Sequence, residues 1–176
     1  MSIELNKGKK LLKIIKNLHK IDRVEQNLDD KIVNWINCIG KFSDTDRVYV
    51  YFFDQDENGF IIANNTHEYC KKGISSAKDD QQNIPIDLFP FHKHLVYDEL
   101  QIAKINNINE LTKEAKSMKE LMEFQGLKSI LALPIISKDS AIGFLGFETI
   151  RKEKNWTNEH IEALKQVAEL IIKNRI

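Results

Sequence analysis

The spacing of apolar residues predicts two helices in the first part of the chain. In the segment KGKKLLKIIKNLHKIDRVEQNL, residues 7–28, apolar and basic side chains recur on opposite sides of a helical wheel. The apolar stripe comprises Leu11, Ile14, Ile15, Leu18 and Ile21, and the basic stripe comprises Lys9, Lys13, Lys16, Lys20 and Arg23. The basic stripe indicates either a solvated surface or a helix that binds a partner or a membrane surface. A second helix is predicted over residues 29–39, with Gly40 as its C-terminal cap.

The pattern then changes to the two-residue period of a β-strand. The segments RVYVYFFD, residues 47–54, and FIIANNTHEY, residues 60–69, are rich in β-branched and aromatic residues and flank an Asn58-Gly59 turn signal. We therefore expect an antiparallel hairpin. In its first strand, one face carries Tyr49, Tyr51 and Phe53, and the other carries Val48, Val50 and Phe52. The valine face is expected to meet the terminal helices, and the tyrosine face is expected to meet a pocket with polar groups.

The remaining segments predict an α+β fold. In order, they read as a polar loop at 71–82, a short helix or irregular turn at 83–95, a short strand at 99–106, a helix at 112–126 and two apolar strands at 128–136 and 141–150. Pro134 indicates a sheet edge or a bulge near that position. A final amphipathic helix begins after Thr157 and continues to Ile176 without a stop signal. Helices thus bracket a mostly antiparallel sheet.

Length, charge and cysteine content narrow the class of protein. The 176 residues suggest one domain, and the formal net charge of zero gives no reason to expect nucleic acid as a partner. The only cysteines are Cys38 and Cys70, so a disulfide framework is not expected. Because no apolar run is long enough to span a bilayer, we expect a cytoplasmic protein without a membrane span.

An ordered set of segments resembles the GAF domain family of sensory modules. These segments are DRVYVYFFD, NNTHEYC, QNIPIDLFPF, FQGLKSILALPI, AIGFLGFETI and NWTNEHIEALKQVAELI. The resemblance implies a five- to six-stranded antiparallel sheet with terminal helices on one face and a ligand pocket on the other. It also implies a homodimer formed through the first and last helices. We divide the chain into a dimerisation helix at 1–24 and a GAF domain at 25–176 that ends in a signalling helix.

The segment THEYC looks like the His-Glu-aromatic-Cys signature of one bacterial branch of this family. Members of that branch commonly accompany diguanylate cyclase (GGDEF), phosphodiesterase, PAS or histidine kinase modules. The resemblance therefore implies a non-catalytic regulatory domain that binds a small molecule, with an output domain beyond residue 176 as a further partner. A dimerisation module with a vestigial pocket is the alternative within the same class.

The candidate site residues follow from the same segments. They are Tyr49, Tyr51, His67, Glu68, Cys70, Phe89, Phe91 and His92. Adjacent strand residues face opposite sides, so His67 and Glu68 are expected to differ in role. We expect Glu68 to tie the strand to a loop by accepting backbone hydrogen bonds, and His67 to lie near the pocket mouth within reach of His92.

Other chemistries fit the sequence less well. A zinc site needs three or four converging ligands, but no CxxC or HExxH spacing is present, and His92 and His94 would diverge on a helix. Reductases of free methionine sulfoxide in this family use several cysteines, whereas Cys38 lies in a predicted helix and leaves Cys70 alone. No cysteine follows Cys70 to attach a bilin, and the cyclic-nucleotide motif of the family is missing. We therefore expect no catalytic or metal-binding residues, and the motifs identify no particular cofactor.

Overall fold

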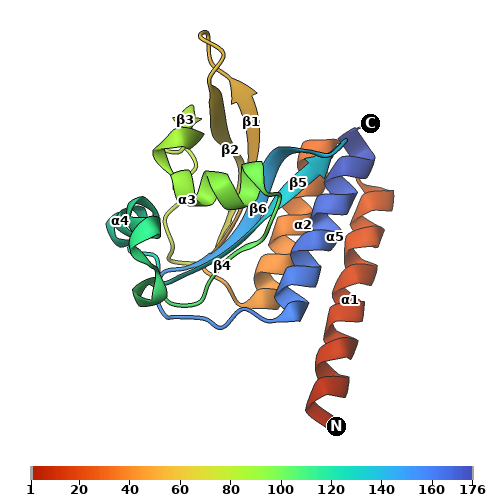
Figure 1. The fold of residues 1–176 in the computed structure, drawn as a ribbon. Helices are drawn as coiled ribbons and strands as arrows, with labels where there is room; N and C mark the ends of the chain where they lie inside the picture. Colours follow the sequence, from red (N-terminus) through yellow and green to blue (C-terminus); the bar gives the residue numbers. More distant parts are fainter. Residues whose placement is uncertain (1, 176) are drawn as a thin grey trace.

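The computed structural model describes residues 2–175, with side chains described from residue 8 onward. Its centre is a six-stranded antiparallel sheet in the order β3-β2-β1-β6-β5-β4 (Figure 1). The strands are β1 (Arg47–Gln55), β2 (Ile61–Cys70), β3 (Ile84–Pro85), β4 (Ala103–Ile105), β5 (Ser129–Ser137) and β6 (Ser140–Thr149). The predicted α+β class and the β1–β2 hairpin are confirmed.

Three helices lie on one side of this sheet: two pack against the sheet, and the N-terminal one packs on the other two (Figure 1). They are α1 (Ser2–Val24), α2 (Leu28–Ser43) and α5 (Asn158–Arg175). The main hydrophobic core lies between them and the sheet, and it includes Val48 and Val50 of β1 together with Trp35 of α2. This burial of aliphatic and aromatic surface is the principal force that holds the helices on the sheet.

Short helices cover the opposite face and close a second core. They are η1 (Ile86–Leu88), α3 (Pro90–Lys93), η2 (His94–Asp98), η3 (Ile108–Glu110), η4 (Lys113–Ala115) and α4 (Lys116–Phe124). Pro90 begins α3, where its missing N–H leaves no helical hydrogen bond unmade. Tyr49 and Tyr51 belong to this second core, so the two faces of β1 have the environments that the alternation predicts.

The predicted cap at Gly40 is wrong. Helix α2 continues through Gly40 to Ser43, and Asp44 caps it with a left-handed φ of 50°. Gly40 instead lets the ring of Tyr69 approach the helix, because a Cβ at this position would lie 2.4 Å from Cδ1 of that ring. The glycine therefore serves packing between α2 and β2.

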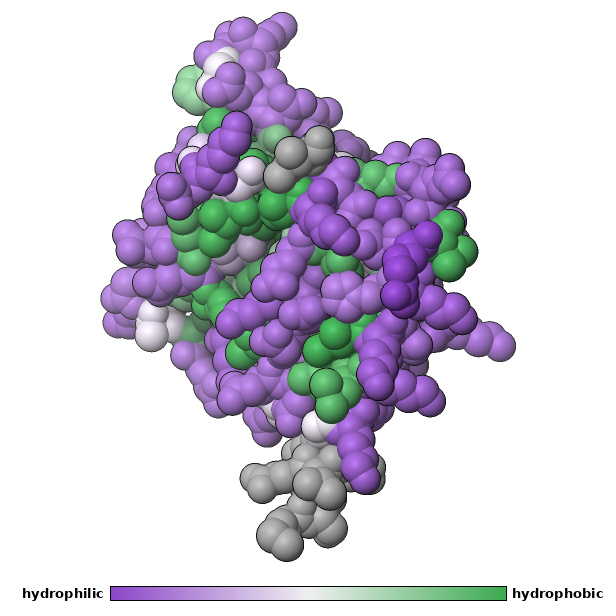
Figure 2. Space-filling view, turned by 90° about the vertical axis from the view of Figure 1, so that its right-hand side faces the viewer, coloured by the Kyte–Doolittle hydropathy of each residue, from purple (hydrophilic) through white to green (hydrophobic). Residues whose placement is uncertain are grey.

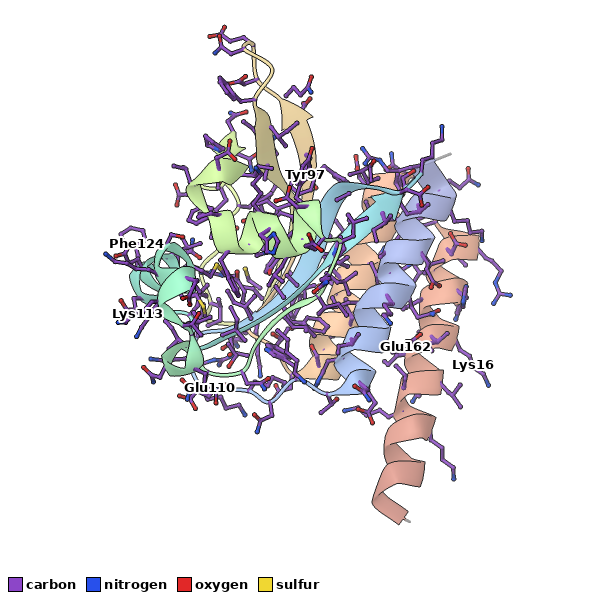
Figure 3. The ribbon with its side chains drawn as sticks, in the orientation of Figure 1. Lys16, Tyr97, Glu110, Lys113, Phe124 and Glu162 are labelled. Carbon is purple, nitrogen blue, oxygen red and sulfur yellow. The ribbon has the colours of Figure 1, made fainter. Side chains whose placement is uncertain are left out.

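The apolar stripe of α1 packs against its own chain. Leu18 is fully buried, and its carbonyl oxygen accepts a hydrogen bond of 3.1 Å from Nε1 of Trp35. Leu11, Ile14 and Ile21 also contact the main core. Basic side chains such as Lys16 point away from the body (Figure 3), and the surface seen from this side is largely hydrophilic with separate hydrophobic areas (Figure 2). The stripe that motivated a homodimer is thus partly covered within one chain, and the homodimer stays a prediction.

None of the helices formed by the described residues has the length and apolar character needed to cross a membrane.

Candidate functional site

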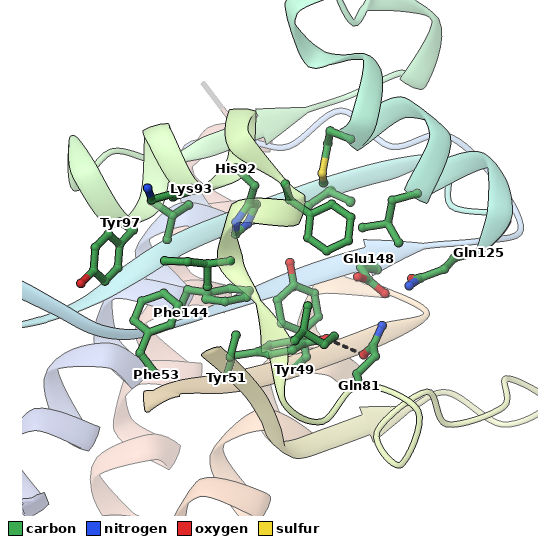
Figure 4. A pocket seen from close by; sticks show the side chains of 18 of the residues that line it. Tyr49, Tyr51, Phe53, Gln81, His92, Lys93, Tyr97, Gln125, Phe144 and Glu148 are labelled. Atoms are coloured by element: carbon green, nitrogen blue, oxygen red, sulfur yellow. Dashed lines mark hydrogen bonds between the residues drawn. The ribbon is translucent and has the colours of Figure 1, made fainter. Parts of the chain in front are cut away.

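A cavity lies between the sheet and the short helices, on the face opposite α1, α2 and α5 (Figure 4). Its volume is about 100 Å³. Because one water molecule needs roughly 10–15 Å³ of such volume, the cavity accommodates roughly seven to ten water-sized groups. Its walls come from β1, β2, β5 and β6, from the segment 81–97 and from α4 with the residues that follow it.

One end of the cavity is aromatic. The rings of Tyr51 and Phe144 stack at 4.5 Å with an interplanar angle of 7°, and Phe53 meets Tyr97 edge-on at 5.1 Å. The ring of His92 lies 4.7 Å from that of Phe144. Burial lowers the pKa of His92 to about 4, so this imidazole is neutral at pH 7. This end is suited to a flat or compact apolar group.

The other end contains a buried carboxyl group. Glu148 of β6 is only 8% exposed, and its Oε2 atom accepts a hydrogen bond of 3.3 Å from Nη1 of Arg47. Burial is the main reason that the pKa of Glu148 is raised to about 7; the charge of Glu68 acts in the same direction, while Arg47 opposes the change. The carboxyl group therefore changes its charge near neutral pH.

The hydroxyl group of Tyr49 lies at the same end. Gly146 on β6 leaves room for it, since a Cβ at this position would lie 2.5 Å from the hydroxyl oxygen. Within the described part of the chain, this hydroxyl has no hydrogen-bond partner. The hydroxyl oxygen is also not one of the fully buried polar atoms, so it keeps some accessible surface. The Tyr49 hydroxyl is thus free to contact a bound molecule.

Tyr51 has a different role, because its hydroxyl group donates a hydrogen bond to Oε1 of Gln81. The same Gln81 oxygen accepts a bond of 3.0 Å from Nδ2 of Asn65, and the Gln81 carbonyl accepts one of 2.9 Å from the Asn65 backbone N–H. These bonds fasten the 71–82 loop to β1 and β2. Tyr51 therefore contributes its ring to the cavity, while its hydroxyl group stabilises the cavity wall.

Glu68, which we expected to contact a ligand, fastens the same loop and is not among the residues that line the cavity. Its Oε2 accepts hydrogen bonds from the Ser76 hydroxyl and, at 3.0 Å, from the Ala77 backbone N–H. Its Oε1 lies 3.4 Å from Nδ2 of Asn65. The predicted tying role is confirmed, because a carboxylate can accept several bonds at once.

His67 faces the helices, so its predicted place at the pocket mouth near His92 is wrong. Its Nε2 atom lies 3.3 Å from Oδ1 of Asp29 at the start of α2. The cause is a β-bulge, in which Tyr51 pairs with Asn65 but Val50 pairs with His67. The extra residue shifts the register by one position and turns His67 to the other face.

Cys70 and Phe91 also lie outside the cavity, whereas Phe89 and His92 line it. The Sγ atom of Cys70 lies 3.3 Å from Oε2 of Glu68. Burial, together with the charge of Glu68, raises the pKa of this thiol to about 12. A thiol with such a pKa is a poor nucleophile. In residues 8–175, whose side chains are described, no three His, Cys, Asp or Glu residues are grouped closely enough to hold a metal ion.

The sequence pattern contains a signal for some cavity residues that we did not predict. Phe144, Gly146 and Glu148 alternate along β6 and therefore share the face that lines the cavity. A glutamate within an apolar strand is unusual, since a buried charge is costly without a partner. Side chains of α4 and of the residues just after it, such as Leu121 and Gln125, reach the cavity only through tertiary packing that the sequence pattern does not specify.

Comparisons with known proteins agree with this architecture. The chain is 26% identical over 147 residues to the methanogenesis regulatory histidine kinase FilI of Methanothrix harundinacea. The match covers 82% of this chain but only 16% of that kinase, so the chain corresponds to a small part of its relative.

Several solved structures share the fold. A phycoerythrobilin-bound GAF domain from a cyanobacterial phytochrome has a TM-score of 0.74 and 17% identity, covering 96% of this chain and 97% of that chain. A far-red absorbing dark state with bound biliverdin IXa has a TM-score of 0.74 and 14% identity, covering 92% of this chain and 97% of that chain. The photoproduct state of GAF3 from Slr1393 of Synechocystis has a TM-score of 0.65 and 16% identity, covering 84% and 92%. The family model for the GAF domain matches residues 37–173, and this chain belongs to the GAF domain family.

Proposed function

We propose that this GAF domain is a non-catalytic sensory module that binds a small molecule and transmits its presence through the terminal helices. The observation that carries the proposal is the aromatic cavity, which contains a buried carboxyl group and a tyrosine hydroxyl to which no described residue is hydrogen-bonded. Pockets that combine apolar walls with a few polar groups are the usual binding sites for small molecules. The raised pKa of Cys70 favours this function over a thiol-dependent reductase.

The size of the cavity favours a ligand smaller than a bilin. Two of the neighbouring structures described above contain a bound bilin, and pockets for drug-sized ligands generally measure about 300–1,000 Å³. The cavity in this chain measures about 100 Å³, and no cysteine follows Cys70 for covalent attachment. We therefore propose a compact, non-covalent ligand of roughly seven to ten non-hydrogen atoms.

Strand β1 supplies a direct connection between the cavity and α5. Phe53 lines the cavity, and its neighbour Phe52 points to the helical face. The guanidinium carbon of Arg175, at the end of α5, lies 3.9 Å from the centroid of the Phe52 ring. A ligand that displaces Phe53 would move the strand and so alter the contact with α5.

A polar cluster around Asp22 then connects all three helices. Its Oδ2 lies 2.8 Å from Nζ of Lys173 on α5, and its Oδ1 lies 3.1 Å from Nζ of Lys31 on α2. Asn174 donates to the same Oδ1 at 2.9 Å. Because Asp22 lies near the end of α1, a movement of α5 would change how α1 is held. We propose that this cluster carries the signal between the chain termini.

The similarity to a histidine kinase supports a role for this domain within a larger signalling protein. FilI is named as a regulatory histidine kinase, and this chain matches a small part of it. We propose that the domain acts in the cytoplasm as part of a homodimeric signalling protein with an output module, such as a kinase or diguanylate cyclase. Any catalytic activity would then belong to that module.

A fragment screen tests whether the cavity binds small molecules. Uniformly ¹⁵N-labelled protein would be titrated with compounds of about seven to ten non-hydrogen atoms, and amide shifts around the cavity would be measured. Ala63→Leu should abolish the shifts by filling the cavity, whereas Ala141→Leu, which lies outside it, should not. Binding that survives Ala63→Leu, or no binding at millimolar concentrations, would favour a dimerisation module with a vestigial pocket.

A further inference from the structure

The polar end of the cavity presents two acceptor atoms without protein partners. Arg47 occupies Oε2 of Glu148, while no other described residue donates a hydrogen bond to Oε1. Oε1 is not a fully buried atom and keeps some accessible surface. Glu148 lines the cavity (Figure 4). The Tyr49 hydroxyl oxygen lies at the same end. A buried carboxylate oxygen is stabilised when a donor reaches it, so this end is built to receive a donor group.

The charged groups near this end favour a donor that is also a cation. Strand β1 supplies the guanidinium of Arg47, while β6 and β2 supply the carboxylates of Glu148 and Glu68, which influence one another electrostatically. The ionised state of this group therefore has a net charge of −1. The Cys70 thiol and the hydroxyl groups of Tyr49 and Tyr51 remain neutral, because each has a raised pKa.

The other charged groups at the cavity do not supply the missing positive charge. Lys93 lies on α3, and its Nζ atom is 3.0 Å from Oδ1 of Asp87. His92 is neutral, because burial lowers its pKa to about 4. A ligand cation would therefore complete the balance, whereas a ligand carboxylate would add a second unpaired negative charge.

The aromatic end suits the apolar part of such a ligand. The stacked rings of Tyr51 and Phe144 and the edge-on ring of Tyr49 form one cluster. Aromatic rings of this kind bind flat or compact apolar groups. A compact body with an amine at one end matches both halves of the cavity.

We propose that the ligand is a small organic amine whose cationic nitrogen contacts Oε1 of Glu148 and the Tyr49 hydroxyl, and whose apolar body lies against Tyr51 and Phe144. This inference rests on the proposed function, because it assigns a ligand class to the same cavity. The amine binds the ionised form of Glu148. Protonation of Glu148 therefore competes with binding, and affinity decreases as the pH falls through 7.

Matched probes test the ligand class. Phenethylamine, 2-phenylethanol and phenylacetate have similar bodies and differ in the polar end, and each would be titrated into the protein by NMR and calorimetry at pH 8 and pH 6. We expect phenethylamine to bind at least about tenfold more tightly than the alcohol or the acid at pH 8. With a Glu148 pKa of about 7, its affinity should fall about tenfold at pH 6.

Two variants test whether the preference for the amine depends on Glu148 and Tyr49. Glu148→Gln should remove the advantage of the amine and its pH dependence while leaving 2-phenylethanol binding within about twofold. Tyr49→Phe should weaken the amine several-fold. Glu123→Gln, an exposed residue of α4, is the matched control and should change neither. Thermal unfolding of each variant would verify that the fold is retained.

The possible failures are distinguishable. Equal or tighter binding of the alcohol or the acid would overturn the amine assignment and leave the sensory cavity in place. Failure of all three probes, together with hits of another class in the fragment screen, would have the same meaning. Failure of the probes and of the whole screen would overturn the proposed function as well.

Discussion

His67 and Glu68 are adjacent in β2 but connect to opposite sides of the molecule. His67 lies 3.3 Å from Asp29 at the start of α2, whereas Glu68 accepts hydrogen bonds from the loop beside the cavity. The bulge in β2 produces this arrangement by pairing Val50 with His67. The two residues therefore have different structural roles, although neither lines the cavity.

Their alanine variants should differ in stability. Glu68→Ala leaves the Ala77 N–H and the Ser76 hydroxyl without their acceptor, and we expect a loss of about 2–3 kcal/mol. His67→Ala removes a contact with an Asp29 side chain that is 80% exposed, together with the packing of an imidazole that is 10% exposed, and we expect a smaller loss of about 1 kcal/mol. Urea unfolding of both variants measures the difference. A His67→Ala loss that equals or exceeds that of Glu68→Ala would contradict these roles.

Cys70 should be chemically inert and dispensable. Because its pKa is raised to about 12, little thiolate is present at pH 8. We expect the native protein to react with a disulfide reagent at least about 100-fold more slowly than the urea-unfolded protein. Cys70→Ser should cost less than about 1.5 kcal/mol, within the range of ordinary substitutions. Rapid reaction of the native thiol would revive the reductase hypothesis.

Glu148 should make stability depend on pH. Its pKa rises from 4.5 to about 7 on folding, so the folded state holds its proton more tightly. The resulting stabilisation is fully present below pH 4.5 and is lost as the pH rises to about 7. Between pH 4.5 and pH 8, we expect wild type to lose up to about 3 kcal/mol relative to Glu148→Gln. If the free energy of unfolding of the two proteins changes with pH in the same way, the pKa of Glu148 is not raised on folding.

Asp22 should hold the three helices together. Burial acts to raise its pKa, but hydrogen bonds from Lys173, Asn174 and Lys31 lower it to about 2. Its stabilisation is therefore present above about pH 4 and is lost as the pH falls toward 2. Asp22→Ala should destabilise the protein by about 1–3 kcal/mol and should increase hydrogen exchange at the end of α1. Unchanged exchange there would remove Asp22 from the proposed signal route.

Much of the fold is predictable from local patterns. The alternation of Tyr49 and Tyr51 with Val48 and Val50 correctly separates the cavity face of β1 from its helical face. This prediction succeeds because strand geometry fixes the direction of successive side chains. The helices and the other long strands follow from the same kind of periodic signal.

The site is less predictable because it depends on register and tertiary packing. Counted from the Asn58-Gly59 turn without a bulge, His67 would lie opposite Tyr49 on the cavity face. The bulge reverses this, and the sequence contains no glycine or proline to indicate it. Glu148 was missed because its role depends on its pairing partner Arg47 in a neighbouring strand.

Occupancy of the cavity should change the arrangement of the terminal helices. In a Cys38→Ser, Cys70→Ser background, spin labels at Lys16→Cys on α1 and Lys165→Cys on α5 would report the distance between the helices. A compound shown by NMR to fill the cavity should shift the distance distribution by about 2 Å or more, the size of common helix shifts in switching proteins. The shift should disappear in Ala63→Leu and persist in Ala141→Leu. A filled cavity with an unchanged distance distribution would contradict the account.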